Sequence, residues 1–372
     1  MTRRETLIAR SIVYAILTAK DDGRPARKPS LLRRALRLFH IYWLSFRLVR
    51  EDLFSLLRGV WMINEDSYKA SFNVRKQMDK KNKGLILIPM GDMGYSGSTF
   101  FRTHDNAYVV KSIPRHFEHD FFKNELLIPY ADHMRVNRSS LLVRITNFLE
   151  STHKTIGTLL GLAPDHHIVM ENILYGQDQV PNSKWESWDL KPISYFFPER
   201  DIAGGALASD ATKSKLADEF KDKIRLSEAQ ATEFHRQIEN DTLLLAKRNA
   251  VDYSLFLVRI SAPDAPAVEP ELLIQLEETG DESTPSVQPP FTPPNPPSWR
   301  TGVVSSDGRE IYRASILDFF WAKHTVHAKA MTTLVRGYNL IDDQGPMSIT
   351  TDSEEYRSRF LDMCKGLVEV HA

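Results

Sequence analysis

The chain has 372 residues, of which 42% are hydrophobic and 26% charged, a composition typical of globular proteins and not of disordered ones. Its 48 Lys and Arg residues balance 48 Asp and Glu residues, so the net charge gives no sign of a polyanionic partner and we expect no nucleic-acid binding. The single cysteine, Cys364, excludes an intramolecular disulfide and is typical of a reducing, intracellular compartment.

The N-terminal region is basic, with twelve Lys and Arg residues against three Asp and Glu residues in the first 50. The apolar run at 7–19 follows two arginines, as in a signal peptide, but Arg10 interrupts it and no clean cleavage site follows. Residues 41–57 carry too many charges to span a bilayer, so we expect no transmembrane segment. We predict a basic N-terminal segment over 1–29, ending in a linker, whose role the sequence leaves open.

Residues 30–60 alternate basic and apolar side chains at roughly helical spacing. The pattern predicts a surface helix that packs its Leu and Phe stripe on the core. The alternative is a basic amphipathic face that lies on an anionic membrane.

The following elements are predicted from periodicity and turn residues. In chain order they are three strands within 83–113, a helix over 116–134, strands around 141–150, 166–176 and 185–193, a helix over 229–249, a β-prone run at 247–260, renewed order over 309–334 and a helix over 354–370. No internal repeat is apparent.

Residues 261–299 are rich in proline and acidic side chains, with nothing to fill a core. We therefore predict a disordered insert, which serves as a solvated spacer. The alternative is a polyproline ligand in its PPFTPPNPP stretch.

Glycines recur every three residues in GDMGYSGS (91–98), between two predicted strands, where backbone amides can approach phosphate oxygens without a Cβ in the way. The stretch matches neither a Walker loop nor a Rossmann fingerprint, and a hairpin with a flexible tip is the alternative. Lys111 follows in the apolar strand AYVVKSI, where a kinase places the lysine that holds nucleotide phosphates. A solvent-facing strand lysine is the alternative for Lys111.

Two aspartates lie in apolar, strand-like runs downstream of that lysine: Asp252 in VDYSLF and Asp318 in ASILDFF. The usual His-Arg-Asp and Asp-Phe-Gly motifs of protein kinases do not occur. Phosphoryl transfer needs one carboxylate to orient or deprotonate the attacking hydroxyl and another to hold Mg²⁺ on the nucleotide. Each aspartate alone is also compatible with a structural role.

The sequence gives little support to zinc or nucleophile chemistry. Its histidines are scattered, no cysteine pair exists, and the adjacent His166 and His167 face opposite ways on a strand. Cys364 lies in the predicted C-terminal helix and is interpreted as a residue that packs in the core, not as a nucleophile. The serine hydrolase pattern does not match at 94–98.

Together these residues resemble the phosphatidylinositol phosphate kinase family, in segments that follow the family order over most of 50–370. The matching segments are GYSGSTFFRTHDNAYVVKSI (94–113) for the Gly-loop hairpin, SSLLVRITNFL (139–149) for the next strand, IVMENILYG (168–176) for the hinge, WDLKPI (188–193) for the Asp-Leu-Lys-Gly-Ser motif, and 218–260 for the segment that ends in Met-Asp-Tyr-Ser-Leu-Leu.

The resemblance implies an α+β, two-lobed lipid-kinase fold of the SAICAR synthetase-like group, with antiparallel sheets and flanking helices. We expect the catalytic domain over 30–372, with an N-lobe at about 30–170 and a C-lobe at about 171–372 that contains the insert.

The resemblance also implies roles for individual residues. Asp252 is the catalytic aspartate, Lys191 and Asp189 accompany it, and Asp318 is the Mg²⁺ ligand. The implied ATP-binding residues are Gly94, Ser96, Gly97, Ser98, Lys111, Met170 and Asn172. The segment 319–334 lies where the family's activation loop meets the membrane and selects the head group, and it carries Lys323, His324, His327 and Lys329. The helix carboxylate that pairs with Lys111 stays open among Glu118, Asp120 and Glu125.

We therefore expect an ATP- and Mg²⁺-dependent kinase that phosphorylates an inositol-ring hydroxyl of a phosphoinositide, in the cytoplasm and peripheral to membranes. Pro192-Ile193 replace the family's Gly-Ser, and proline removes an amide that could face a phosphate. The alternatives are a weak or inactive nucleotide- or phosphoinositide-binding scaffold and, third, a soluble small-molecule or protein kinase. The ring position, and whether the chain forms a homodimer, stay open.

Overall fold

The structure is a computed structural model that describes residues 2–19, 42–73, 87–90, 98–180, 182–192, 220–262, 291–323 and 351–371. Several predicted features lie outside these ranges: Gly94, Ser96, Gly97, His324, His327, Lys329, the linker at 21–30 and most of the predicted insert.

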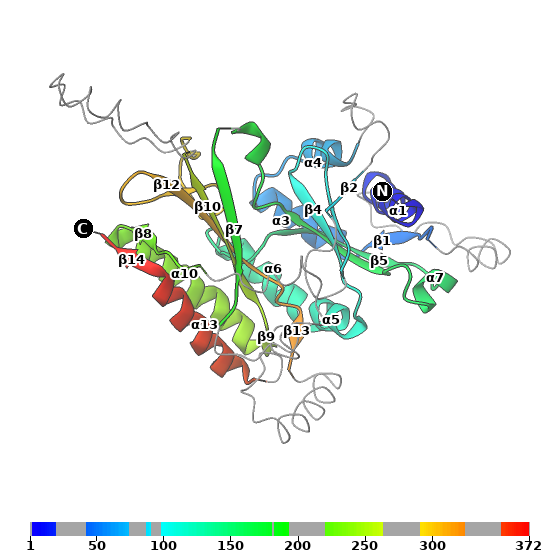
Figure 1. Cartoon of the computed structure of the whole chain (residues 1–372). Helices are drawn as coiled ribbons and strands as arrows, with labels where there is room; N and C mark the ends of the chain where they lie inside the picture. The colour runs from blue at the N-terminus through cyan, green and yellow to red at the C-terminus, as the bar shows by residue number, and fades with distance from the viewer. Residues whose placement is uncertain are drawn as a thin grey trace, which may run out of the picture.

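A six-stranded antiparallel sheet forms the centre of the N-lobe, with strand order β1-β5-β6-β4-β3-β2 (Figure 1). Its strands are β1 (Phe46–Leu48), β2 (Ile88–Pro89), β3 (Phe100–Arg102), β4 (Tyr108–Ser112), β5 (Ile145–Ser151) and β6 (His166–Glu171). Side chains of β4 alternate between the two faces of the sheet, so that Val109 packs into one hydrophobic cluster and Val110 into another.

Helices cover both faces of this sheet. Those of the N-lobe are α1 (Arg3–Thr18), α3 (Glu51–Val60), α4 (Glu65–Phe72), α5 (His116–Phe121), the π-helical turn η2 (Phe122–Leu126), α6 (Leu127–Val136) and the short α7 (Ile156–Leu159). Helix α1 buries Ile8, Ile12 and Ile16, which recur at helical spacing, against the cluster that contains Val110. Residues 3–18 therefore contribute to the N-lobe core.

The predicted surface helix over 30–60 is wrong for residues 42–50, and its part at 30–41 lies outside the described residues. Phe46–Leu48 form edge strand β1, which pairs with β5, and Arg50, with a left-handed φ of 52°, is the N-cap of α3. Pairing with the sheet overrides the helical periodicity here, because local propensity is weaker than tertiary contacts.

The C-lobe is built on a four-stranded antiparallel sheet of order β11-β12-β10-β7. Its elements are β7 (Lys184–Leu190), β10 (Ser254–Ser261), β11 (Val303–Val304) and β12 (Glu310–Leu317), with helices α10 (Glu228–Lys247) and α13 (Ser353–Leu367) packed beside each other. Smaller elements are the 3₁₀ turn η3 (Gln177–Gln179), the strand pair β9 (Ala250–Val251) and β13 (Trp321–Ala322), and the pair β8 (Ile224–Leu226) and β14 (Val368–Val370).

The two lobes share one hydrophobic cluster and a backbone connection. The N–H of Ile316 on β12 donates to the carbonyl of Leu141 at 2.7 Å, and the N–H of Val143 donates to the carbonyl of Ile316 at 3.1 Å. Antiparallel sheets with flanking helices confirm the expected α+β fold class. None of the described helices combines the length and the apolar character needed to cross a membrane.

The structure describes both ends of the predicted insert, residues 261–262 and 291–299. Ser261 ends β10, and Trp299 is 6% exposed, with its ring centroid 4.3 Å from that of Phe234 on α10. The expectation that this stretch adds nothing to the core is therefore wrong at its last residue. A tryptophan among prolines carries no periodic signal, so only the tertiary contact reveals its role.

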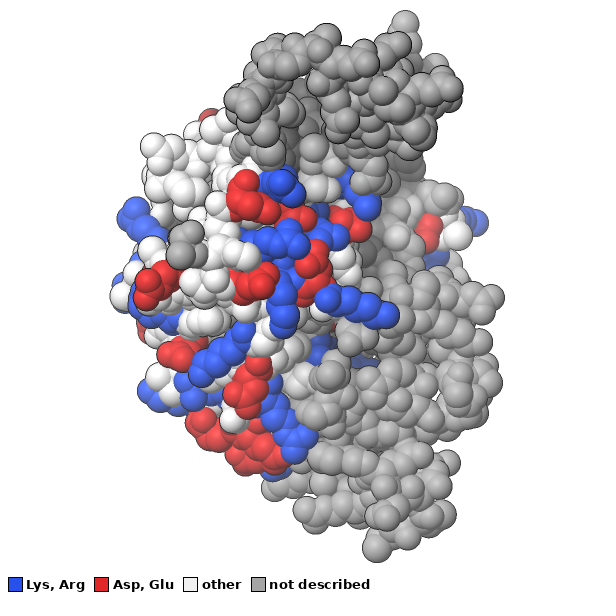
Figure 2. Space-filling model, turned by 60° about the vertical axis from the view of Figure 1, so that its left-hand side comes forward, with Lys and Arg blue, Asp and Glu red and all other residues white. Residues whose placement is uncertain are grey.

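Charges of both signs lie interleaved on the C-lobe side of the molecule, as the described part of the face in Figure 2 shows. Arg259 on β10 pairs with Glu186 at 2.8 Å and with Asp222 at 2.7 Å, and Arg225 pairs with Asp222 at 3.2 Å. These mutually neutralised side chains give the described part of this face no patch of one sign for an anionic surface.

Cys364 is predicted to be unreactive in the folded protein. Its side chain is 1% exposed on α13, and burial raises the pKa of the thiol, so little thiolate is present or accessible. A thiol reagent should label the native chain far more slowly than the chain in denaturant, measured by absorbance of the released chromophore. Native labelling as fast as that of the denatured chain would contradict this packing role.

Candidate active site

Lys111 is held in the middle of the N-lobe sheet. On β4 it lies opposite Phe100 on β3 and Ile168 on β6, and only 6% of the residue is exposed. Its ammonium lies 5.4 Å from the centre of the Phe100 ring and pairs with the carboxylate of Asp318. A lysine with this burial is not the solvent-facing strand residue of the alternative interpretation.

Asp318 reaches Lys111 from the other lobe. It follows β12 in a left-handed conformation with a φ of 61°, and the buried Phe319 and Phe320 come next. Desolvation opposes the charge of this carboxyl, but Lys111 and then Lys191 outweigh it, so the pKa of Asp318 lies below its usual value. Asp318 is therefore an ionised group between two lysines.

Asp252 lies in a turn, not in the middle of a strand. The run at 247–260 breaks into β9 and β10, and Asp252 between them has a φ of 64°. Its Oδ1 lies 2.9 Å from Nζ of Lys191, which directly follows β7. Desolvation lowers the pKa of Lys191, but Asp252 and then Asp189 outweigh it and raise the pKa overall, so this lysine is charged.

The cluster thus alternates in sign: Lys111, Asp318, Lys191 and Asp252 come from the ends or middle of four strands in both lobes. Asp189 lies on β7 opposite Phe256, two residues before Lys191. Sequence analysis singled out all five residues, and the structure brings Lys111, Asp318, Lys191 and Asp252 together through two ion pairs. Such a set of charges can hold and neutralise a phosphate-rich ligand.

Four further predicted site residues lie in the described part of the chain. Ser98 is buried before β3, and Met170 lies on β6 with 9% exposure. The side-chain amide of Asn172 donates to the carbonyl of Asn106 at 2.8 Å and accepts from the N–H of Leu174 at 3.1 Å, so it fixes the turn after β6 to the β3–β4 hairpin. Lys323 lies 3.6 Å from Asp352.

The helix carboxylate expected beside Lys111 is best represented by Glu118 on α5. Glu118 accepts a hydrogen bond from Arg115 at 3.0 Å, and burial raises the pKa of its carboxyl against the opposing effects of Arg115 and Lys111. Asp120 instead pairs with His119, and Glu125 is exposed. Among the described residues Lys111 itself pairs with Asp318 and not with a helix carboxylate.

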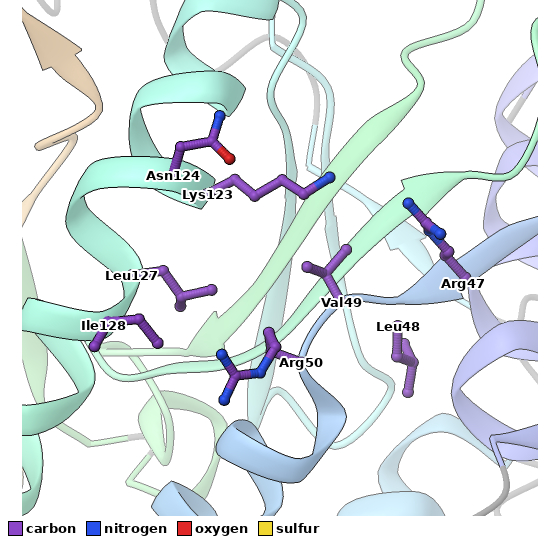
Figure 3. A pocket seen from close by; sticks show the side chains of 8 residues that line it. All are labelled: Arg47, Leu48, Val49, Arg50, Lys123, Asn124, Leu127 and Ile128. Atoms are coloured by element: carbon purple, nitrogen blue, oxygen red, sulfur yellow. The ribbon is translucent and has the colours of Figure 1, made fainter. Parts of the chain in front are cut away.

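A cavity of about 370 Å³ lies elsewhere, between β1 and the helical segment η2–α6 (Figure 3). Its lining residues are Arg47, Leu48, Val49, Arg50, Lys123, Asn124, Leu127 and Ile128. None of them belongs to the charged cluster, so the chemistry inferred from Lys111 and the aspartates does not take place in this cavity.

Several histidines that are scattered in the sequence lie close together in the structure. His116 and His119 are one turn apart on α5, and His166 begins β6 with Asp165 directly before it. Sequence reasoning missed this cluster because it compared only neighbouring positions; the spacing of three on a predicted helix was the available signal.

Comparison with known proteins identifies the family. Residues 81–367, more than half of the chain, match the family model described as phosphatidylinositol-4-phosphate 5-kinase. The chain belongs to this family. The phosphatidylinositol phosphate kinase resemblance seen in the sequence is thereby confirmed at the level of the family.

Two relatives in this kinase family are similar to the chain at low identity. A probable phosphatidylinositol phosphate kinase of Dictyostelium discoideum is 27% identical over 226 residues, which are 59% of this chain and 29% of that protein. Phosphatidylinositol 4-phosphate 5-kinase-like protein 1 of Mus musculus is 26% identical over 204 residues, which are 55% of this chain and 46% of that protein. The matched part is thus less than half the length of either relative.

Proposed function

We propose that the protein is an ATP-dependent lipid kinase, which transfers the γ-phosphate of ATP to an inositol-ring hydroxyl of a membrane phosphoinositide. The observation that carries the proposal is the presence of two ion pairs, Lys111 with Asp318 and Lys191 with Asp252, in a member of this kinase family. Phosphoryl transfer depends on positioned cations and carboxylates more than on covalent chemistry by the protein.

Each charged residue has a task in this proposal. Lys111 binds the nucleotide phosphates from the N-lobe, together with the amides that begin β3 near Ser98. Asp252 accepts a hydrogen bond from the attacking hydroxyl and orients it, and Lys191, held by Asp252 at 2.9 Å, binds the phosphoryl group being transferred.

The residues also suit Mg²⁺, the metal usual for such kinases. Asp318 offers ionised carboxylate oxygens, and a Mg²⁺ ion needs only one or two protein carboxylates when phosphates supply further ligands. When bound, the ion would neutralise charge on the phosphates and draw electron density from the leaving oxygen.

Pro192, which departs from the family motif, does not prevent the ion pair between Lys191 and Asp252. Lys191, directly before the proline, keeps its contact with Asp252. This contact favours an active kinase over the inactive scaffold. Lys323 and the basic residues of 1–50 support a location at an anionic membrane surface, peripheral to the bilayer.

The proposal is tested by offering the full chain Mg-ATP and vesicles that each contain one mono-phosphorylated phosphatidylinositol. We expect the labelled γ-phosphate of ATP to appear in one of these lipids. The Lys111→Met variant, which keeps the stem but loses the charge, should transfer phosphate at a rate lower by at least about 10²-fold. Lys365→Met, an exposed lysine on α13, is the matched control and should retain the rate.

Two results would overturn the proposal. Nucleotide binding without transfer to any lipid would leave the scaffold function. Transfer to a soluble inositol phosphate or a protein in preference to every vesicle would leave a soluble kinase.

A further inference from the structure

A second group of potential ligands lies between helix α5 and the start of strand β6. His116, Asp165 and His166 each offer one ligand atom, and these atoms all lie within 4.8 Å of one another. A ring nitrogen of His119 lies within the same distance of His166, in a second trio completed by Glu150. His166 belongs to both trios and is the centre of the cluster.

Two of these histidines are buried. His119 and His166 are each 4% exposed, and their rings stack with centroids 3.6 Å apart. Nδ1 of His166, 3.0 Å from Oδ1 of Asp165, is buried and makes no hydrogen bond among the residues that the structure describes. An orphaned buried nitrogen is costly, and a bound ion would satisfy it.

We propose that His116, Asp165 and His166 bind one divalent transition-metal ion of the zinc class. Two imidazoles and one carboxylate form a nitrogen and oxygen ligand set that suits Zn²⁺ and Co²⁺ and not Mg²⁺, with the fourth tetrahedral position left for water. The side chain of His116 is 61% exposed and provides the route by which an ion enters.

Lys154 competes with the ion for this site. Its ammonium lies 2.6 Å from Oδ2 of Asp165 and 3.2 Å from Nε2 of His116, so it supplies the positive charge that a metal ion would supply. The Lys154 side chain is 52% exposed and can move into solvent. Metal binding therefore displaces this ammonium, and removing it should tighten binding.

The ion would link helix α5 to strand β6 of the N-lobe sheet, beside the charged cluster that contains Lys111. Glu118, the helix carboxylate whose pKa is raised by burial and, to a smaller extent, lowered by the charge of Lys111, lies between His116 and His119 on α5. His166 begins β6, which pairs with β4 at Lys111. A metal bridge from α5 to β6 would hold Glu118 in place relative to Lys111, so the site is suited to stabilising the N-lobe.

The test measures Co²⁺ and Zn²⁺ binding to the full chain without a histidine tag, by calorimetry and by the visible absorption of tetrahedral Co²⁺. We expect one equivalent per chain, a rise in the thermal unfolding midpoint with Zn²⁺, and no comparable effect of Mg²⁺. His116→Gln, which replaces an exposed side chain and should fold, is expected to weaken binding by more than about 100-fold, beyond the usual cost of losing an outer-shell partner.

Further variants distinguish metal binding from a packing role. His166→Gln should also weaken binding, whereas Lys154→Gln should strengthen it, which a packing defect would not do. His371→Gln, on an exposed histidine near the C-terminus, is the matched control and should bind as the unmodified chain does. Absence of a one-equivalent Co²⁺ spectrum, or binding that His116→Gln leaves unchanged, would overturn the proposal.

Discussion

Replacing Asp252 with asparagine is expected to slow phosphoryl transfer to the lipid by about 10²–10⁴-fold, the range lost when a positioned proton acceptor is removed. The variant keeps the shape of the side chain but removes the charge that faces Lys191 at 2.9 Å. Asparagine also tolerates the φ of 64° at this position, so the fold should be retained. Initial rates at saturating Mg-ATP, together with nucleotide affinity and thermal unfolding, measure the effect.

Two further variants separate the charge of Asp252 from its backbone conformation. Asp252→Ala should lose the same activity and about 1 kcal/mol of stability as well, because alanine disfavours the left-handed region. Asp362→Asn, on the exposed side of α13, should change neither quantity. A transfer rate that survives Asp252→Asn would remove Asp252 from the reaction and leave it a turn residue.

The helices and strands could be predicted where burial imposes one clear period. The helix over 116–134 appears as α5, η2 and α6, and the strand around 166–176 contains β6. Residues 46–50 could not be predicted correctly, because an edge strand of three residues has too few side chains to outweigh a helical pattern. Sheet order is likewise set by long-range pairing, as in β1 with β5.

The charged residues of the candidate site could be found in the sequence, but not their pairing. Lys111 and Asp318 are far apart in the chain, and sequence reasoning sought the partner of Lys111 on the following helix. The left-handed turns at Asp252 and Asp318 were also missed, because apolar neighbours made both positions resemble strands. Aspartate is among the few residue types that adopt this conformation readily, which is the signal that was available.

Replacing Asp241 with asparagine is expected to destabilise the protein by about 3–5 kcal/mol, the usual cost of removing one partner from a buried charged network. Asp241 on α10 is fully buried. Its carboxylate lies 2.6 Å from Nε2 of His133 and accepts hydrogen bonds from the hydroxyl of Ser140 at 2.7 Å and the N–H of Leu141 at 2.6 Å. An asparagine amide would place a donor among these donors. Equilibrium denaturation of the two proteins measures the difference.

The control is Asp132→Asn on the neighbouring α6, whose pair with Arg135 at 3.4 Å is exposed, and it should change stability by less than about 0.5 kcal/mol. Equal stability of Asp241→Asn and Asp132→Asn would contradict the structural role of this network.

Asp241→Asn is also expected to lower the rate of phosphoryl transfer, because the network around Asp241 is connected to the end of β12. The carbonyl of Leu141 accepts hydrogen bonds from the N–H of Ile316 at 2.7 Å and from the hydroxyl of Ser315 at 2.9 Å, at the end of β12 directly before Asp318. Asp241 thus fixes the segment from which Asp318 is positioned. At a temperature where Asp241→Asn remains folded by circular dichroism, its transfer rate should be lower than that of Asp132→Asn, and equal rates would show that Asp318 is positioned without this network.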